Sequence, residues 1–132
     1  MRPEATSLFC EYDRGDSCVL EARFSVVGLY VIAEAYPKEA DQSVHLEVFF
    51  PDHRGFALFD ESDMPSWLGA ECFRTGHLVY RVLHGGWFDS RDQKDCFLQI
   101  ASSQCNEWLI VTANECVSVF SSSEPRVRVL SV

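Results

Sequence analysis

The side chains of this chain best suited to metal binding or nucleophilic chemistry are its four histidines and six cysteines. His53, His77 and His84, together with Cys72, would combine the imidazole and thiolate donors that zinc prefers. Their spacing in the sequence matches no closed zinc site, and scattered ligands of this kind are usually ordinary surface or core residues. We therefore expect no metal site and no other cofactor.

Two further patterns could belong to an enzyme. His45 and Glu47 have the H-x-E form of the zinc deaminases, but those enzymes also need a P-C-x-x-C motif, and no two cysteines here stand three positions apart. Cys72 is the best placed thiol for a nucleophile, yet its neighbour Glu71 disfavours a thiolate. The chain also lacks the glycine-rich nucleotide loops and the G-x-S-x-G nucleophile elbow. Whether the protein is an enzyme stays open, and the lack of a catalytic motif favours a non-enzymatic role.

Two groups of carboxylates and one aromatic pair stand out as candidate contact residues. The carboxylates could form an acid and base pair or a cation site, but neither group has the pattern of a calcium loop. The pair Trp87 and Phe88 follows two glycines and would serve either as partner anchors or as core residues after a bend. The expected partner-binding set is Asp60, Glu61, Asp63, Trp87, Phe88, Asp89, Asp92 and Asp95.

Hydrophobic periodicity predicts the elements that must position these residues. Apolar and polar residues alternate from Cys18 to Val26, which indicates a half-buried strand, whereas the run from Leu29 to Tyr36 is apolar on both faces and indicates a central strand. Gly28 between them predicts a bend. The alternating run from Val44 to Phe50 follows a polar connection of hairpin length, so it is expected to pair with the central strand.

The remaining segments extend this β pattern along the chain. Further strands are expected at 8–12, 56–59, 77–84, 96–101, 107–112, 116–120 and 126–132, with a tight hairpin turn at 112–115. One short helix is expected near residues 63–71, where a proline and a terminal glycine frame the segment. The fold class is therefore mainly β, an antiparallel curled sheet, sandwich or barrel of about eight to nine short strands. An α+β fold is the alternative.

Length and composition restrict the class of protein. The 132 residues suit a single domain, 1–132, and 47% apolar against 23% charged residues is a globular composition. The formal charge of -9 argues against nucleic acid or an anionic membrane as partner and favours a basic protein. Because the N-terminus has no apolar export segment and no run is long enough to span a bilayer, we expect a cytoplasmic protein whose cysteines are free, buried thiols.

Three functional hypotheses follow from these properties. The first is a non-enzymatic protein-binding or inhibitory module of the immunity-protein type, which docks a basic partner through an acidic surface. The alternative is a small-ligand-binding β-barrel-like protein or an enzyme, with a pocket lined by the abundant aromatic residues. A homodimer that pairs the strand 126–132 across a two-fold axis is a third hypothesis, although Arg126 and Arg128 would equally protect that strand from self-association.

Overall fold

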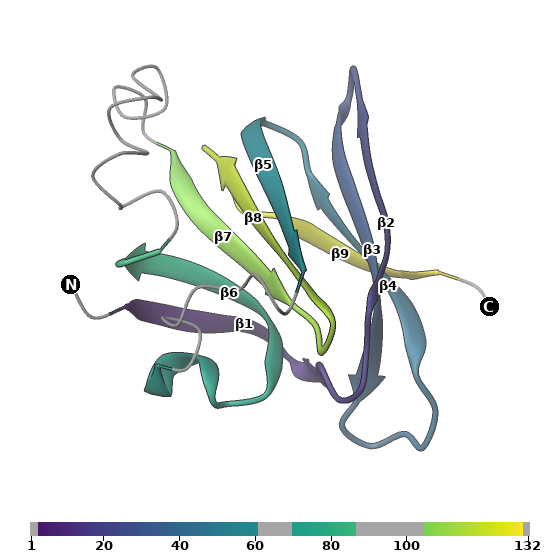
Figure 1. The fold of residues 1–132 in the computed structure, drawn as a ribbon. Helices are drawn as coiled ribbons and strands as arrows, with labels where there is room; N and C mark the ends of the chain where they lie inside the picture. The colour runs from purple at the N-terminus through teal and green to yellow at the C-terminus, as the bar shows by residue number, and fades with distance from the viewer. Residues whose placement is uncertain (1–2, 61–69, 87–104, 131–132) are drawn as a thin grey trace.

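The computed structural model describes residues 3–60, 70–86 and 105–130, and in them it places nine strands and one 3-10 turn. Every strand pairing is antiparallel. The strands are β1 (Glu4–Asp13), β2 (Val19–Ser25), β3 (Gly28–Pro37), β4 (Val44–Phe50), β5 (His53–Asp60), β6 (His77–His84), β7 (Asn106–Val111), β8 (Glu115–Ser121) and β9 (Arg126–Leu130), and the turn is η3 (Glu71–Phe73). Figure 1 shows these elements with the two chain ends on opposite sides of the molecule.

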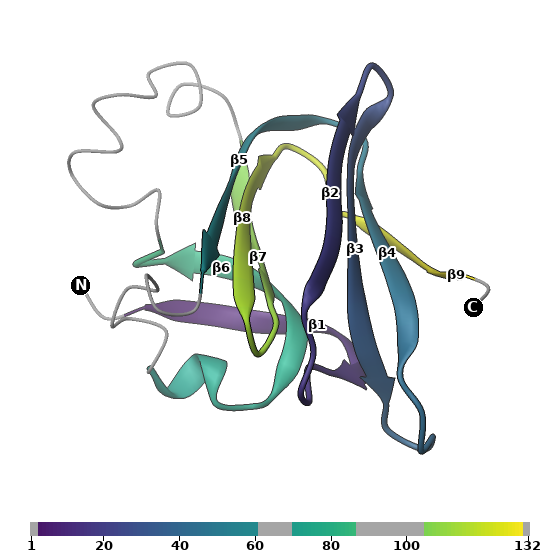
Figure 2. The same ribbon diagram turned by 45° about the vertical axis from the view of Figure 1, so that its right-hand side comes forward.

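The strands form one curled, unclosed sheet with the order β5-β8-β7-β6-β1-β3-β4-β9, and β2 pairs with β3 outside this path. The curl brings two halves face to face, with β5, β7 and β8 on one side and β2, β3 and β4 on the other (Figure 2). In the same view β1 and β6 run across one end of the molecule. A mainly β, curled antiparallel sheet is thus confirmed.

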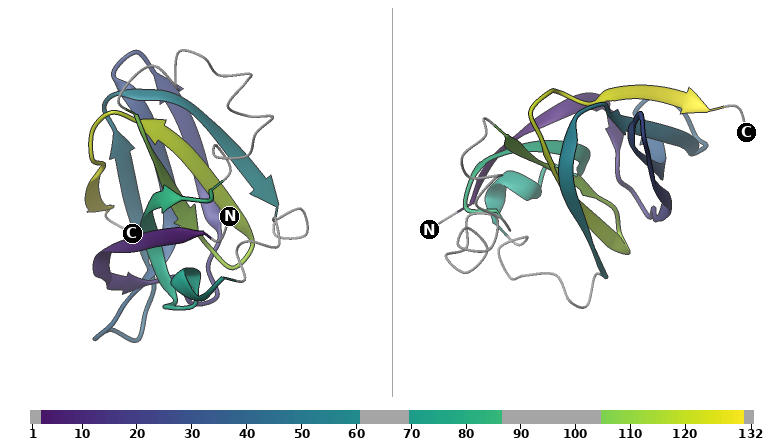
Figure 3. Two further views of the ribbon diagram at one scale, coloured as in Figure 1. Left: turned by 90° about the vertical axis from the view of Figure 1, so that its left-hand side faces the viewer. Right: turned by 90° about the horizontal axis from the view of Figure 1, so that it is seen from above.

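Two long ribbons connect the halves. β4 passes almost directly into β5, and β8 passes into β9, yet β4 pairs with β9 in one half while β5 pairs with β8 in the other. At the bend between the halves the Ser122 hydroxyl donates to the Asp52 carboxylate, and the Ser122 N–H donates to the Asp52 carbonyl oxygen. The two views of Figure 3 show how these strands cross from one half to the other. Because of this bend, the pair β4–β9 lies in one half and the pair β5–β8 lies in the other, and both halves cover the same core.

The main core lies between the two halves. Its fully buried members alternate along β3 and β4, which follows from the period of two in a strand whose inner face is covered. Leu29, Val31, Ala35, Leu46, Val48 and Phe50 come from β3 and β4, and they pack against Leu78 and Val79 of β6 and against Trp108, Ile110, Val117 and Val119 of β7 and β8. A second cluster under η3 contains Phe73, Tyr80, Val82, Leu109, Val111 and Cys116. Trp108 is therefore a core residue.

Strand β1 joins the halves because it changes partner along its length. Its first part pairs with β6, and its last two residues pair with β3, with Tyr12 opposite Pro37 and Asp13 opposite Tyr36. Between these parts the register shifts and Phe9 adopts a positive φ of 51°, so the strand bends. The strand is longer than the predicted 8–12, because its first residues have no clear alternation but still form pairs with β6.

Several predicted elements differ in detail or cannot be compared. The hairpins expected at 37–42 and 112–115 are present, and β5 begins at His53, three residues before the strand predicted at 56–59. Most of the helix expected near 63–71 and the strand expected at 96–101 lie outside the described residues. Of that predicted segment the structure describes only residues 70 and 71, and Glu71 begins the 3-10 turn η3, which is the only helical element the structure assigns to residues 3–60, 70–86 and 105–130.

Candidate functional site

Of the residues predicted to bind a partner, only Asp60 lies in the described part of the chain. It is exposed at the end of β5, directly opposite Glu115 at the start of β8. The other seven, Glu61, Asp63, Trp87, Phe88, Asp89, Asp92 and Asp95, lie outside the described residues. The prediction for them is not tested.

The candidate metal ligands are held apart by separate local contacts. His77 Nδ1 lies 2.8 Å from Ser7 Oγ, His84 Nε2 lies 2.9 Å from a carboxylate oxygen of Glu4, and the His53 ring packs against two phenylalanines. Among the residues that the structure describes, no three His, Cys, Asp or Glu side chains form a group that could hold a metal ion.

The thiols of Cys72 and Cys116 lie in surroundings that disfavour the thiolate. The five described cysteines are free, Cys116 is buried, and Cys10 is exposed, which corrects the expectation that the thiols are buried. Burial raises the pKa of Cys72, so the thiolate form that a nucleophile requires is disfavoured. Burial likewise raises the pKa of Cys116.

A chain of hydrogen bonds clamps β1 to β6 and η3. The Arg14 guanidinium donates to the Tyr80 hydroxyl at 2.6 Å and to the carbonyl oxygens of Phe73 and His77 at 2.6 and 3.0 Å. The Tyr80 hydroxyl also lies 2.7 Å from Thr75 Oγ1. The Ser7 and His77 contact has the distance of a nucleophile and base pair. Ser7 Oγ also lies 3.3 Å from Thr75 Oγ1, so this contact is part of the hydrogen-bonded network that links β1 to β6.

The β1–β2 turn, the β3–β4 loop and the β7–β8 turn meet at one end of the molecule (Figure 1), and these turns and the adjoining strand residues contain several carboxylates. Short contacts hold these segments together: the Lys38 N–H donates to the Glu11 carbonyl oxygen at 3.0 Å, and the Val19 N–H donates to the Glu115 carboxylate at 2.8 Å. We name this region the acidic end, and its carboxylates are Glu11, Asp13, Asp16, Glu34, Glu39 and Glu115. Its neighbouring Arg14 points inward to the clamp described above.

The Cys18 thiol reports the electrostatic potential of the acidic end. It donates a hydrogen bond to the Glu34 carboxylate at 3.0 Å, and this bond is the largest cause that raises its pKa to about 11. Burial and the charges of Glu34, Glu115 and Asp16 raise the pKa further. The negative charges of Glu34, Glu115 and Asp16 therefore act together on the Cys18 thiol.

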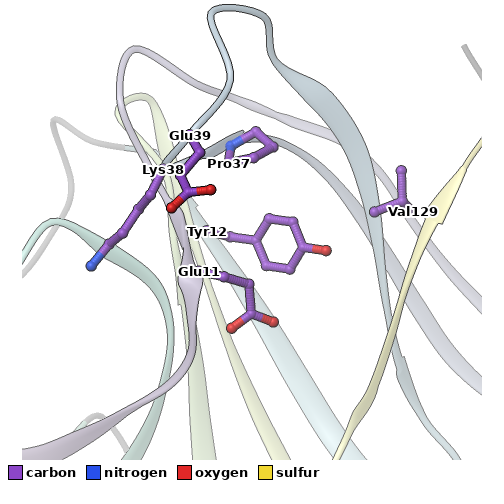
Figure 4. Close-up of a pocket in the computed structure, with 6 residues that line it drawn as sticks. All are labelled: Glu11, Tyr12, Pro37, Lys38, Glu39 and Val129. Atoms are coloured by element: carbon purple, nitrogen blue, oxygen red, sulfur yellow. The ribbon is translucent and has the colours of Figure 1, made fainter.

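A hollow of about 490 Å³ opens in the acidic end and is lined by Glu11, Tyr12, Pro37, Lys38, Glu39 and Val129. In Figure 4 the carboxylates of Glu11 and Glu39 lie on either side of Tyr12, whereas the Lys38 amino group points away from them. A cation that enters the hollow would meet two carboxylates and the face of an aromatic ring. The geometry suits a lysine or arginine side chain.

Three comparisons with known proteins add no relative to this description. No family model, curated protein or solved structure matches the chain. Among the described residues, no helix is both long and apolar enough to cross a membrane. The candidate site therefore depends on the geometry of the acidic end alone.

Sequence reasoning missed the acidic end because its members come from distant segments. Glu11 and Glu39 meet only because the last residues of β1 pair with the last residues of β3. The one local signal was the density of acids in residues 11–16 and 39–41, which is equally typical of solvated turns.

Proposed function

We propose that this protein is a non-enzymatic binding module that docks a basic partner protein through its acidic end. The observation that carries the proposal is the hollow in which Glu11 and Glu39 flank Tyr12, while Lys38, the one cation among the described lining residues, turns its amino group away. A basic side chain of the partner fits this hollow, and Asp60 opposite Glu115 extends the negative surface along the neighbouring edge.

Negative charge acts on a basic partner both during its approach and after it enters the hollow. The formal charge of -9 steers a basic protein toward the molecule, and this contribution decreases as salt is added. Inside the hollow, a guanidinium would gain charge-assisted hydrogen bonds to the carboxylates and a contact with the ring, each worth about 1–3 kcal/mol. We expect the hollow to supply an anchor at the centre of a larger contact.

The proposed class is an inhibitory or neutralising module of the immunity-protein type, acting in the cytoplasm. Small size and strong acidity support this class. The five described cysteines are free, which supports a reducing compartment. A fold of short antiparallel strands can carry many functions, so the surface and not the fold supports the proposal.

The test uses an arginine-rich peptide as a probe and a paired substitution in the hollow. Glu11→Gln with Glu39→Gln should weaken peptide binding about tenfold or more in calorimetry, because two charged acceptors are lost. The matched control is Glu71→Gln with Glu124→Gln, which removes the same net charge from two exposed acids away from the hollow. The proposal fails if both pairs weaken binding equally, or if binding is the same at low and high salt.

A further inference from the structure

The outer face of β2, β3, β4 and β9, which points away from β5, β7 and β8 (Figure 2), carries an aromatic pair between two arginines. Arg23 on β2 is opposite Tyr30 on β3, Tyr30 is opposite Phe49 on β4, and Phe49 is opposite Arg126 on β9. These residues face outward because the residues that alternate with them along β3 and β4 are fully buried. The strand register thus assembles one continuous row from both ends of the chain.

The aromatic floor of this row is fixed in place. The ring centroids of Tyr30 and Phe49 are 4.6 Å apart with an interplanar angle of 35°, and the Arg23 guanidinium lies 4.9 Å from the Tyr30 centroid. Gly28 makes room for Phe49, since a Cβ at position 28 would lie 2.6 Å from its ring. The Phe49 ring therefore packs on backbone and is held before any ligand arrives.

Of the three guanidinium groups beside the aromatic floor, two lie near a carboxylate and that of Arg126 does not. Arg128 pairs with the nearly buried Glu47 at 3.2 Å, so its guanidinium already has a carboxylate partner although 69% of the Arg128 side chain is exposed. Arg23 lies 3.7 Å from Glu21. The Arg126 guanidinium, by contrast, has no hydrogen bond or ion pair with any residue that the structure describes, and Arg126 is exposed opposite Phe49.

A hollow of about 450 Å³ lies over this arrangement. Its volume is in the range typical of small-molecule sites. The residues that line it are Tyr30, Glu47, Phe49, Arg126, Val127 and Arg128.

We propose that this hollow binds a small aromatic carboxylate. The ring of the ligand stacks on Phe49 and Tyr30, and its carboxylate accepts hydrogen bonds from the Arg126 guanidinium, whose planar fork matches a carboxylate. A long polyphosphate is disfavoured because Glu21 and Glu47 lie in the adjacent row and the whole chain is acidic. A neutral ring alone would leave the guanidinium without a partner.

This site is on a different face from the acidic end and requires the opposite ligand charge, so the two proposals can fail independently. The probe for the test is 2-naphthoate, whose two fused rings match the neighbouring rings of the floor. We expect saturable binding by its fluorescence and by chemical shifts at β3, β4 and β9. Arg126→Gln should raise the Kd about tenfold or more, because a charge-assisted pair is lost, and Phe49→Leu should raise it about fivefold, because the stacking ring is lost.

Matched ligands and variants decide the outcome. Cyclohexanecarboxylate has the charge without an aromatic ring, and 2-naphthalenemethanol has the aromatic rings without the charge, so both should bind at least about tenfold more weakly than 2-naphthoate. Arg54→Gln removes an exposed arginine on β5, outside the lining set, and should leave the Kd unchanged. Equal binding of either matched ligand, an unchanged Kd for Arg126→Gln, or no binding of 2-naphthoate would overturn the proposal.

Discussion

The Cys18 thiol donates a hydrogen bond to the Glu34 carboxylate, with Sγ and Oε1 3.0 Å apart. This contact joins the start of β2 to β3 inside the acidic end, and the Glu34 N–H returns a bond to the Cys18 carbonyl oxygen at 3.0 Å. The pair therefore combines a structural link with an electrostatic effect that can be measured through the reactivity of the thiol.

Removing the Glu34 charge should activate Cys18. In the native protein its pKa is raised to about 11, first by the bond to Glu34, so little thiolate exists near pH 8. Glu34→Gln should raise the rate of alkylation of Cys18 by iodoacetamide at pH 8 about tenfold, measured by mass spectrometry on the peptide that contains Cys18. Glu71→Gln on η3 is the control, and an equal increase there would contradict the assignment.

His53 should make the fold sensitive to acid. Burial lowers its pKa below the ordinary 6.5, with a smaller opposing effect from Asp52, and its Nδ1 has no hydrogen-bond partner among the described residues. Because the unfolded chain takes up the proton first, the contribution of His53 is present above pH 6.5 and is lost as pH falls below it. Urea titrations at pH 7.5 and 5.5 should show a smaller loss of stability for His53→Gln than for the native protein.

The control for that experiment is another histidine substitution, His45→Gln on β4. It should keep the acid-dependent loss of the native protein, because His53 is still present. If His53→Gln and the native protein lose the same free energy of unfolding between the two pH values, the packing of this ring between Phe24 and Phe56 does not control its protonation.

Gly28 should tolerate no side chain. Its φ is +147°, and a Cβ there would lie 2.5 Å from the Phe50 carbonyl oxygen as well as against Phe49. Gly28→Ala should lower the free energy of unfolding by about 2 kcal/mol or more, because backbone strain and overpacking act together. Gly76→Ala is the matched control: its φ is +80° but nothing lies within 4 Å, so we expect a loss of only about 1 kcal/mol. Equal losses in urea denaturation would contradict the packing argument.

The Tyr80 hydroxyl should matter more to stability than that of the half-buried Tyr36. Tyr80 is fully buried, and its hydroxyl joins Arg14 to Thr75. Tyr80→Phe leaves the guanidinium without one acceptor and should cost about 1–3 kcal/mol in thermal or urea unfolding. Tyr36→Phe, which removes a single 3.3 Å bond to the Asp16 carbonyl oxygen at the surface, should cost no more than about 0.5 kcal/mol. Similar costs for the two variants would show that the clamp is not important for stability.

Sequence patterns predicted the local parts of this fold well, because they depend on neighbouring residues. The buried strand β3, its hairpin with β4 and the hairpin of β7 with β8 follow from apolar periodicity and from turn residues. The pairing of β1 with β6 was outside the reach of this reasoning, since Ser7 lies opposite Tyr80 across more than half of the chain. Periodicity specifies which face of a strand is buried but not which strand lies beside it.

The candidate sites were missed for the same physical reason. Both hollows lie where strands from distant segments meet, and the residues that line them read individually as turn acids or as edge arginines. The sequence pointed instead to local clusters, of which only Asp60 lies in the described part of the chain. At the second hollow, the register between β4 and β9 places the charge of Arg126 beside the ring of Phe49.

The arginines of β9 should also keep this edge strand from pairing with a second copy. In a two-fold antiparallel pairing, residues of the same face lie opposite one another, so a centre at residue 126, 127 or 128 places arginine against arginine. Arg126→Thr with Arg128→Thr removes this repulsion and adds good strand formers. Light scattering should then detect dimers at concentrations where the native chain stays monomeric. Arg74→Thr with Arg81→Thr changes the net charge equally and should stay monomeric, whereas a native dimer that dissociates on the β9 substitutions would reverse the role assigned to these arginines.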